Sequence, residues 1–413
     1  MSNTIEELKK ALKRGDELVV LPSRITGTIR VPYGVRWKTE GITTLAPQAK
    51  LYLDGPQEGK SHYKIFDALA GQIQGHFGGE EVQVGWWSGY DPEKVDDITP
   101  HIEAAAKARR PSSSTLKEWN KNLDVKYITG DITGGSVRLP AGLWSVRSTI
   151  NLGSRYVSLK GAGETTALHF LGLGATAGIL IKGAAKNSSI SHMAMIVDPS
   201  CDPEFVTIRL QSGFLEGTHF HHLFMRGTRK AAFETIGMSS NHFRVSDCHI
   251  IDPQNEDSIG FLARALSDRF SWHNNTVAQI QKRGKWKRHI DISGYDKISI
   301  RDSHFECAQD SAISINDERG GGKKRPSVLV ESCFHNFGNG YWRKTERPQG
   351  VGALVHITAP FASVTVIQSQ TTNGDTVLID ETHDHLIEQS GAGNNIIVRY
   401  ERTDKECQQI TSR

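Results

Sequence analysis

The stretch that decides the fold reads His242-Phe-Arg-Val-Ser-Asp247, and it returns as Arg269-Phe-Ser-Trp-His-Asn274 and as Lys297-Ile-Ser-Ile-Arg-Asp302. In each version apolar and polar residues alternate, which is typical of a β-strand with one buried face. A small polar residue closes each version, and short polar side chains favour bends because they bond to nearby backbone. The pattern predicts a short strand followed by a bend, repeated every 27 or 28 residues.

The same unit extends in both directions from this stretch. Its apolar anchors are Val157, Ile190, Phe220, Phe243, Phe270, Ile298, Val328 and Val364. Repeats of this size indicate coils of a solenoid, in which one coil buries its apolar face only against the next. No long amphipathic helix separates the strands, which argues against βαβ units, and the hairpin turns of a propeller are missing. We therefore expect an all-β fold, a right-handed parallel β-helix.

Three segments are expected along the chain. Residues 1–136 are predicted to form an N-terminal region of short strands with a capping helix from Asp96 to Lys107, a mixed cap that contains short helices. Residues 137–400 form the predicted β-helix, and residues 401–413 form a C-terminal tail. Residues 1–16 have the pattern of an amphipathic helix, so no signal peptide is expected, and the sequence leaves the location of the protein open.

Bulk composition excludes several classes of protein. A net charge of +3 over 413 residues gives no general affinity for nucleic acid. No apolar run is long enough for a membrane span. The five cysteines are widely spaced and suit reduced, buried thiols.

No cofactor and no metal are expected. The glycines of Gly161-Ala-Gly163 and Gly320–Gly322 lie in turns and not in a nucleotide-binding loop. His219, His221 and His222 cluster without a carboxylate at ligand spacing, as do His383 and His385. We interpret them as surface or groove histidines.

Two families resemble parts of this chain. Gly85-Trp-Trp-Ser-Gly89, followed by Val95-Asp-Asp-Ile-Thr99, resembles the segment before the first coil of phage tailspikes and related bacterial β-helix proteins. The coils resemble the pectate-lyase-like β-helix superfamily. Within it they are similar to inulin fructotransferases, through His289-Ile-Asp-Ile-Ser-Gly294, Gly350–Thr358 and Val377–Gly391. This resemblance implies a homotrimer with carboxylates at the active site, and it points to Asp291 and to Asp257.

The second strand of each coil carries the candidate active site. Its first and third residues are apolar and face inward, so its second and fourth residues face outward. The predicted first outward column is Thr207, Glu234, Gly260, Asp291, Ser314 and His356. The predicted second column is Arg209, Ile236, Leu262, Ser293, Asn316 and Thr358.

Glycosidic-bond cleavage uses two carboxyl groups on opposite sides of the bond. Glu234 and Asp291 are two coils apart, which puts them about 9.6 Å from each other at the usual spacing of parallel strands. We expect Asp291 to act as nucleophile or general base and Glu234 or Asp257 as proton donor. The predicted substrate-binding residues beside them are Arg209, Ser314, Asn316 and His356. The sequence thus favours an enzyme that cleaves a polysaccharide, as a hydrolase or a transferase.

Basic segments near this column leave two alternatives open. The segments are Lys282–His289, Lys323–Arg325 and Arg343–Arg347, with Trp286 and Trp342 as predicted stacking platforms for sugar rings. They fit a subsite for an acidic sugar. The protein is then a polysaccharide lyase, with Lys287, Arg288 or His289 as the base of a β-elimination. The other alternative is a non-catalytic, tailspike-like carbohydrate-binding protein.

Overall fold

The computed structural model describes residues 4–59, 63–108, 135–152, 157–182, 188–212, 217–238, 242–280, 285–316, 326–336, 353–359, 362–367, 369–371, 376–380, 395–399 and 411–412. Contacts between residues divide the chain into two compact units. The first unit holds Met1–Leu168 and Ser188–Met193, and the second holds His169–Asn187 and Ala194–Arg413. The predicted segment boundaries at residues 136 and 400 remain predictions. None of the described helices is long and apolar enough to cross a membrane.

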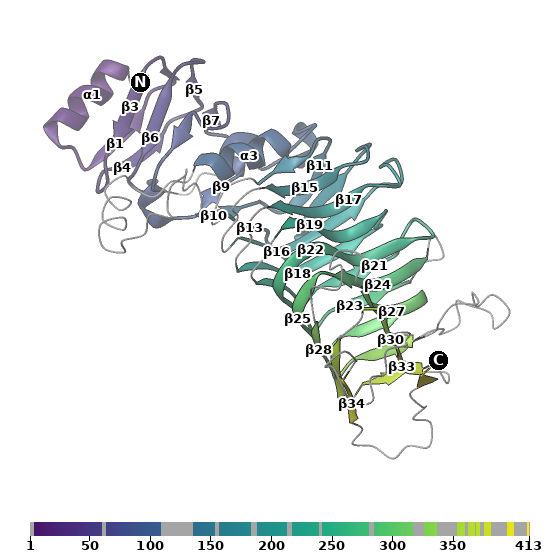
Figure 1. Cartoon of the computed structure of the whole chain (residues 1–413). Coiled ribbons are helices and arrows are strands. Elements are labelled where there is room, and N and C mark those ends of the chain that lie inside the picture. Colours follow the sequence, from purple (N-terminus) through teal and green to yellow (C-terminus); the bar gives the residue numbers. More distant parts are fainter. Residues whose placement is uncertain are drawn as a thin grey trace, which may run out of the picture. The chain divides into compact units, whose positions relative to one another are not determined.

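The first unit begins with helix α1 (Ile5–Arg14) and continues into short parallel strands (Figure 1). Thr4 and Glu7 form a reciprocal capping box at the start of α1, which satisfies backbone donors of its first turn. Strand β1 (Leu18–Leu21) pairs with β4 (Arg36–Thr39). The other early strands are β2 (Arg24–Ile25), β3 (Thr28–Val31), β5 (Thr43–Leu45), β6 (Lys50–Leu53), β7 (Phe66–Asp67), β8 (Ile73–Gln74) and β9 (Val82–Gln83).

The predicted capping helix is present as α3 (Thr99–Ala108), after the short α2 (Gly85–Ser88). The carboxylate of Asp97 accepts hydrogen bonds from the backbone N–H of Thr99 and the hydroxyl of Ser148, which fixes the helix start. The apolar face of α3 is buried through Ile102 and several alanines. The remaining elements of this unit are β10 (Gly135–Arg138), β11 (Gly142–Val146), β12 (Ile150–Asn151), β13 (Val157–Lys160) and the 3-10 turns Phe77–Gly79, Pro92–Lys94 and Gly163–Thr165.

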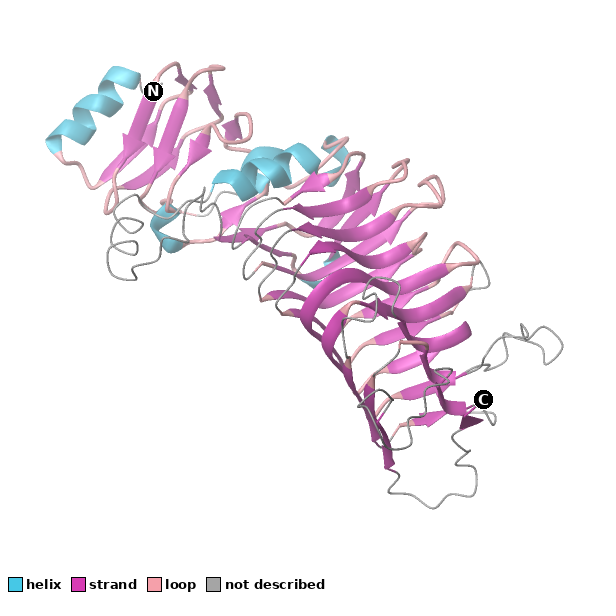
Figure 2. Cartoon of the chain, viewed as in Figure 1, coloured by secondary structure: helices cyan, strands magenta, loops and turns pink. Residues whose placement is uncertain are grey.

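The second unit is a parallel β-solenoid, so the predicted fold class is confirmed (Figure 2). The first strands of successive coils form one sheet, here called the first sheet. It contains β16 (Ser189–Val197), β18 (Thr218–Arg226), β20 (Phe243–Ser246), the end of β22 (Ser258–His273), β25 (Tyr295–Arg301), β28 (Ser327–Glu331), β31 (Ser363–Ile367) and β34 (Asn395–Arg399).

The second strands form another parallel sheet, here called the second sheet. It contains β15 (Ala177–Lys182), β17 (Val206–Ser212), β19 (Ala231–Met238), the start of β22, β24 (Trp286–Ser293), β27 (Ala308–Asn316), β30 (Ala353–Ile357), β33 (Thr376–Asp380) and β35 (Thr411–Ser412). Short strands between the two sheets are β14 (Thr166–Phe170), β21 (His249–Ile251), β23 (Thr276–Ala278), β26 (His304–Glu306), β29 (Phe334–Asn336) and β32 (Gln370–Thr371).

The strand registers in the first sheet show whether the apolar anchors of successive coils were aligned correctly from the sequence. Phe243, Phe270, Ile298, Val328 and Val364 lie directly beside one another in successive coils, as predicted. The alignment is wrong one coil earlier, where Thr218 and not Phe220 lies beside Phe243. A slip of two residues keeps every side chain on its face, so the alternating pattern alone does not detect it.

The bends after these strands are confirmed. Asp247, Asn274, Asp302 and Ser332 have φ values of 55°, 52°, 48° and 52°, in the left-handed region that short polar residues tolerate. The side-chain amide of Asn274 donates to the Asp247 carboxylate at 2.8 Å, so adjacent coils are also joined through their bends.

Apolar side chains fill the inside of the solenoid. The rings of Phe261 and Phe270 stack with their centroids 4.5 Å apart. Cys201, Cys248, Cys307 and Cys333 are buried thiols, while Cys407 lies outside the described residues. Burial raises the pKa of the Cys248 and Cys333 thiols to about 12, so these thiols are held in the unreactive protonated form.

Gly260 has a structural role in the solenoid. A Cβ atom at this position would lie 2.5 Å from the backbone oxygen of His289 in the next coil. The glycine therefore permits close packing of two coils. Gly260→Ala should lower the free energy of unfolding by about 1–3 kcal/mol, the usual cost of forcing an extra group into a packed core.

Urea unfolding measures this loss. Gly174→Ala is the matched control, because a Cβ at Gly174 meets nothing within 4 Å. An equal effect of both substitutions would show that the contact with His289 is unimportant.

Candidate functional site

A column of polar residues runs along the second sheet. The registers place Arg209, Glu234, Leu262, Asp291, Ser314 and His356 beside one another in successive strands. Arg209 therefore takes the position predicted for Thr207, and Leu262 takes the position predicted for Gly260. In both cases the predicted alignment was displaced by two residues, so the expected and the observed residue lie on the same face of the strand. Asn316 lies beside Ser293 in the second column, as predicted.

A groove of about 630 Å³ opens beside this column. Its lining combines charged and aliphatic side chains. They are Lys230, Glu234, Ile236, Ile259, Leu262, Arg264, Lys287, Arg288 and Asp291. Glu234 and Asp291 are separated by the one strand that carries Leu262, which corresponds to about 9.6 Å at the usual strand spacing.

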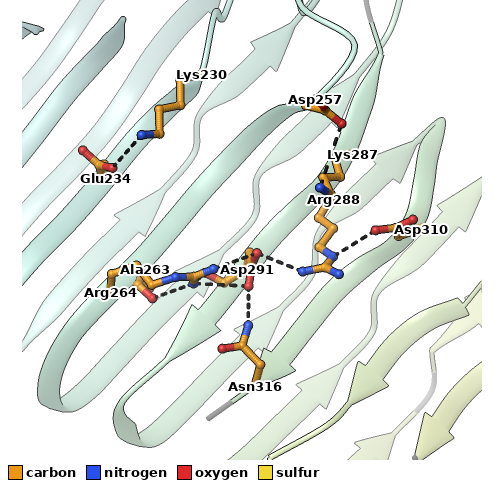
Figure 3. Close-up of polar contacts among 10 residues, drawn as sticks. All are labelled: Lys230, Glu234, Asp257, Ala263, Arg264, Lys287, Arg288, Asp291, Asp310 and Asn316. Carbon is orange, nitrogen blue, oxygen red and sulfur yellow. Dashed lines mark hydrogen bonds and ion pairs between the residues drawn. The ribbon is translucent and has the colours of Figure 1, made fainter. Parts of the chain in front are cut away.

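Asp291 is a buried ion-pair centre (Figure 3). Arg264 donates to both carboxylate oxygens, at 3.2 Å to Oδ1 and 3.0 Å to Oδ2. Arg288 donates to Oδ2 at 3.0 Å, and Asn316 donates to Oδ1 at 2.6 Å. A carboxylate has roughly four lone-pair positions, so these four bonds occupy both oxygens. The sequence predicted an exposed carboxylate, but only 3% of Asp291 is exposed.

Glu234 is the second buried carboxylate of the groove, with 5% of its surface exposed. Oε2 is bound by the guanidinium of Arg209, and Oε1 lies 3.9 Å from the ammonium group of Lys230. Oε1 therefore has the looser contact and is the oxygen better placed to accept a proton.

Asp257 does not belong to this buried pair. It lies in the turn before β22, its side chain is 78% exposed, and its only ion pair among the described residues is a 4.0 Å contact with Lys287. The role of proton donor that we expected for Asp257 calls for a buried carboxyl group, and Asp257 is exposed.

Trp286 and His289 lie in the core and offer no surface to a substrate. The indole N–H of Trp286 donates to the backbone oxygen of Ala278 at 2.9 Å. The His289 ring stacks on Phe305 with centroids 5.4 Å apart, and its Nε2 is hydrogen-bonded to the backbone oxygen of Glu306. The predictions that Trp286 stacks on a sugar ring and that His289 is the base of a β-elimination are therefore wrong. The register of β24 is irregular between Trp286 and Arg288, so the regular alternation of faces does not hold there.

The other predicted site residues divide into three groups. Lys287 and Arg288 line the groove, and Arg209 contacts it through Glu234. Ser314 and His356 continue the column, with 2% and 8% of their surfaces exposed. Trp342, His383 and His385 lie outside the described residues.

Sequence reasoning missed Lys230, Arg264 and Asp310. Arg264 follows Leu262 by two residues and thus shares its outward face, so strict use of the strand period would have found it. Asp310 contacts Arg288 at 3.3 Å, a pairing between adjacent coils that only the register reveals.

The histidines of β18 lie in the first sheet, away from the groove lining. His219 and His221 stack with their centroids 4.3 Å apart, and His219 Nε2 is 3.0 Å from the Ser246 hydroxyl. Burial lowers the pKa of His219 to about 4, so this ring is neutral at pH 7.

The pKa values of two buried histidines predict that the folded protein loses stability in acid. Burial lowers the pKa of His289 to about 3 and that of His335 well below 6.5. The unfolded chain therefore binds more protons than the folded chain below pH 6.5, and stability is lost as the pH falls towards the folded-state values. Between pH 6.5 and 5 we expect a loss of about 2 kcal/mol from His289 and a further loss in the same direction from His335.

Urea unfolding at several pH values measures the loss. His335→Phe should remove the part of the loss that His335 causes, because phenylalanine fills a similar space and does not titrate. His249→Gln, at an exposed position, is the control and should leave the pH dependence unchanged. An unaltered dependence in His335→Phe would contradict the assignment.

Comparisons with known proteins give only distant structural matches. No family model and no curated protein matches the chain. Geobacillus virus E2 ORF18 matches with 13% identity and a TM-score of 0.36, over 73% of this chain and 61% of that chain. The catalytic unit of a GH87 α-1,3-glucanase from Streptomyces thermodiastaticus matches with 13% identity and a TM-score of 0.35, over 92% of this chain and 61% of that chain. The chain thus spans about three fifths of both proteins, and no comparison assigns it to a family.

Proposed function

We propose that the chain binds a carbohydrate polymer in the groove of the second sheet and cleaves its glycosidic bonds. The observation that carries this proposal is the placement of Glu234 and Asp291 in one groove, two strands apart in a continuous register. Their separation of about 9.6 Å is at the outer edge of the range for carboxylates that flank a glycosidic bond in inverting enzymes. The elongated, repeating surface of a solenoid also suits a linear polymer.

The contacts give the two carboxylates different roles in this proposal. Glu234 is the general base, because Oε1 is the oxygen with the looser contact and can accept a proton from water or a sugar hydroxyl. Asp291 is a positioning residue, because its oxygens are occupied by Arg264, Arg288 and Asn316. Lys230 and Lys287 line the same groove; one of their ammonium groups donates a proton to the leaving oxygen and regains one from Glu234 when the products leave.

A β-elimination on an acidic polymer is the second candidate. The observation in its favour is that four basic side chains line the groove beside two carboxylates. Of the three predicted bases, His289 is buried and Arg288 is bound to Asp291, so Lys287 becomes the base in this mechanism. The unsaturated product of such a reaction distinguishes it from hydrolysis.

A panel of plant, fructan and bacterial polysaccharides tests the proposal. Two readouts are taken together, namely new reducing ends or cyclic anhydrides and the absorbance of unsaturated uronates. Products without the absorbance support hydrolysis or transfer, and products with it support elimination. Binding without turnover on every polymer would overturn the proposed cleavage and leave a tailspike-like binding protein.

We also propose the homotrimer that the family resemblance implies. Sedimentation equilibrium should then give three times the 45.7 kDa of one chain. A mass of 45.7 kDa at micromolar concentrations would contradict a trimer.

A further inference from the structure

We propose that the groove takes an anionic glycan, a polymer with carboxylate or sulfate groups, and that Arg264 and Arg288 bind those groups while Asp291 holds the two arginines in place. This inference rests on the proposed function and adds the charge class of the substrate. The charges, contacts and exposure of the groove residues support it.

The two arginines are fixed before any ligand arrives. Asp291 accepts two hydrogen bonds from the Arg264 guanidinium and one from that of Arg288 (Figure 3). Arg264 also donates to the backbone oxygens of Ala263 and Asp291, at 3.0 Å and 3.3 Å. A guanidinium has five N–H donors in one plane, a geometry that matches the oxygens of a carboxylate or sulfate. Fixing this geometry in advance lowers the entropy cost of binding.

The lining of the groove itself carries more positive than negative charge. It contains Lys230, Arg264, Lys287 and Arg288 and two carboxylates, those of Glu234 and Asp291. Both carboxylates are at most 5% exposed, so they do not repel a ligand at the surface. Further carboxylates that pair with these cations lie outside the lining, and a negatively charged group of a ligand would take their place.

Acidic residues at the rim make further contacts with these cations. Glu204 contacts Lys230 at 3.0 Å, and Asp257 contacts Lys287 at 4.0 Å, with side chains 63% and 78% exposed. Exposed ion pairs of this kind contribute roughly 0–1 kcal/mol, so an anionic ligand can replace them.

Arg288 has a donor that the protein does not satisfy. Its Nε atom is buried and forms no hydrogen bond among the described residues, although Asp310 Oδ2 lies 3.3 Å away. A buried donor without a well-aligned acceptor is costly, and a ligand oxygen that displaces the Asp310 side chain would remove that cost.

The aliphatic part of the lining favours a glycan over a nucleic acid. Ile236, Ile259 and Leu262 provide an apolar surface between the charged groups, which suits the C–H faces of sugar rings. The described lining contains no aromatic side chain on which a base could stack, and base stacking is the usual way of holding single strands.

Affinity electrophoresis of the full chain tests the inference without requiring turnover. The gels contain polygalacturonate, dextran sulfate, neutral dextran or double-stranded DNA. At least one acidic polymer should retard the protein while dextran does not, and the two acidic polymers distinguish a carboxylate from a sulfate ligand. Arg264→Gln should weaken the retardation at least tenfold, the order of effect of removing one member of a buried charged pair.

Arg226→Gln is the matched control. Arg226 pairs at 3.1 Å with the buried Asp252, outside the groove, so its loss should leave the retardation unchanged. If Arg264→Gln lacks a cooperative thermal transition, Arg264→Lys and Arg288→Gln take its place. Arg264→Lys keeps the charge without the planar fork, and both variants should bind more weakly than the wild type.

Four results would overturn the inference. They are equal retardation by dextran, retardation by neither acidic polymer, an equal loss in Arg226→Gln, and stronger retardation by double-stranded DNA than by either polymer. A different result is expected if the inference holds and the proposed cleavage does not. Acidic polymers would be bound through Arg264 but never cleaved.

Discussion

Glu234→Gln is expected to lower turnover on a confirmed polysaccharide substrate by about a hundredfold or more, the usual scale for a positioned acid–base group. Glutamine keeps the size of the side chain and one oxygen but cannot act as the base. The loss should appear mainly in kcat, since Oε1 faces Lys230 in the groove and its proposed task is proton transfer. Steady-state kinetics across a range of substrate concentrations separates kcat from KM.

Glu331→Gln is the control for this substitution. Glu331 pairs with Arg301 at 3.1 Å in the first sheet, so its loss removes an arginine–glutamate contact without touching the groove. Its activity should equal that of the wild type. Near-normal kcat in Glu234→Gln would exclude Glu234 as the base.

Asp291→Asn is expected to lower kcat/KM by about a hundredfold, mainly through a higher KM. Asparagine keeps the shape but directs an amide N–H₂ at guanidinium groups that now receive a carboxylate oxygen. Arg264 and Arg288 then lose the partner that orients them. The free energy of unfolding should also fall, by about 1–3 kcal/mol, because charged hydrogen bonds are lost at a buried position.

Asp252→Asn separates the loss of stability from the loss of binding. Asp252 is 4% exposed and pairs with Arg226 at 3.1 Å, but it lies outside the groove. This variant should lose a similar amount of stability and keep its KM. An unchanged KM in Asp291→Asn, or an equal rise in Asp252→Asn, would contradict the positioning role.

The fold was largely predictable because it depends on local patterns that repeat. Alternation within each strand gave the buried face, and the small polar residues after the strands marked bends that have positive φ values in the structure. The register between coils was less predictable. Leu262, and not Gly260, lies beside Glu234, because a slip of two residues preserves the alternation.

The candidate site was predictable in position and not in its contacts. The outward column correctly brought Glu234 and Asp291 to one face two coils apart. Alternation says which face a residue occupies, but not how far neighbouring side chains cover it. Arg264 in β22 and Arg288 in β24 cover Asp291. Because of this burial we propose that Asp291 is a positioning residue and not the base that we expected.

The sequence by itself determined the solenoid, its bends and the face on which the carboxylates lie, since each of these follows from residues close together in the chain. Only the tertiary structure decided which charges meet. Arg264, Arg288 and Asn316 come from three strands of the second sheet, and all of them bind Asp291. Such contacts depend on the register of stacked coils and on side-chain reach, neither of which a single strand encodes.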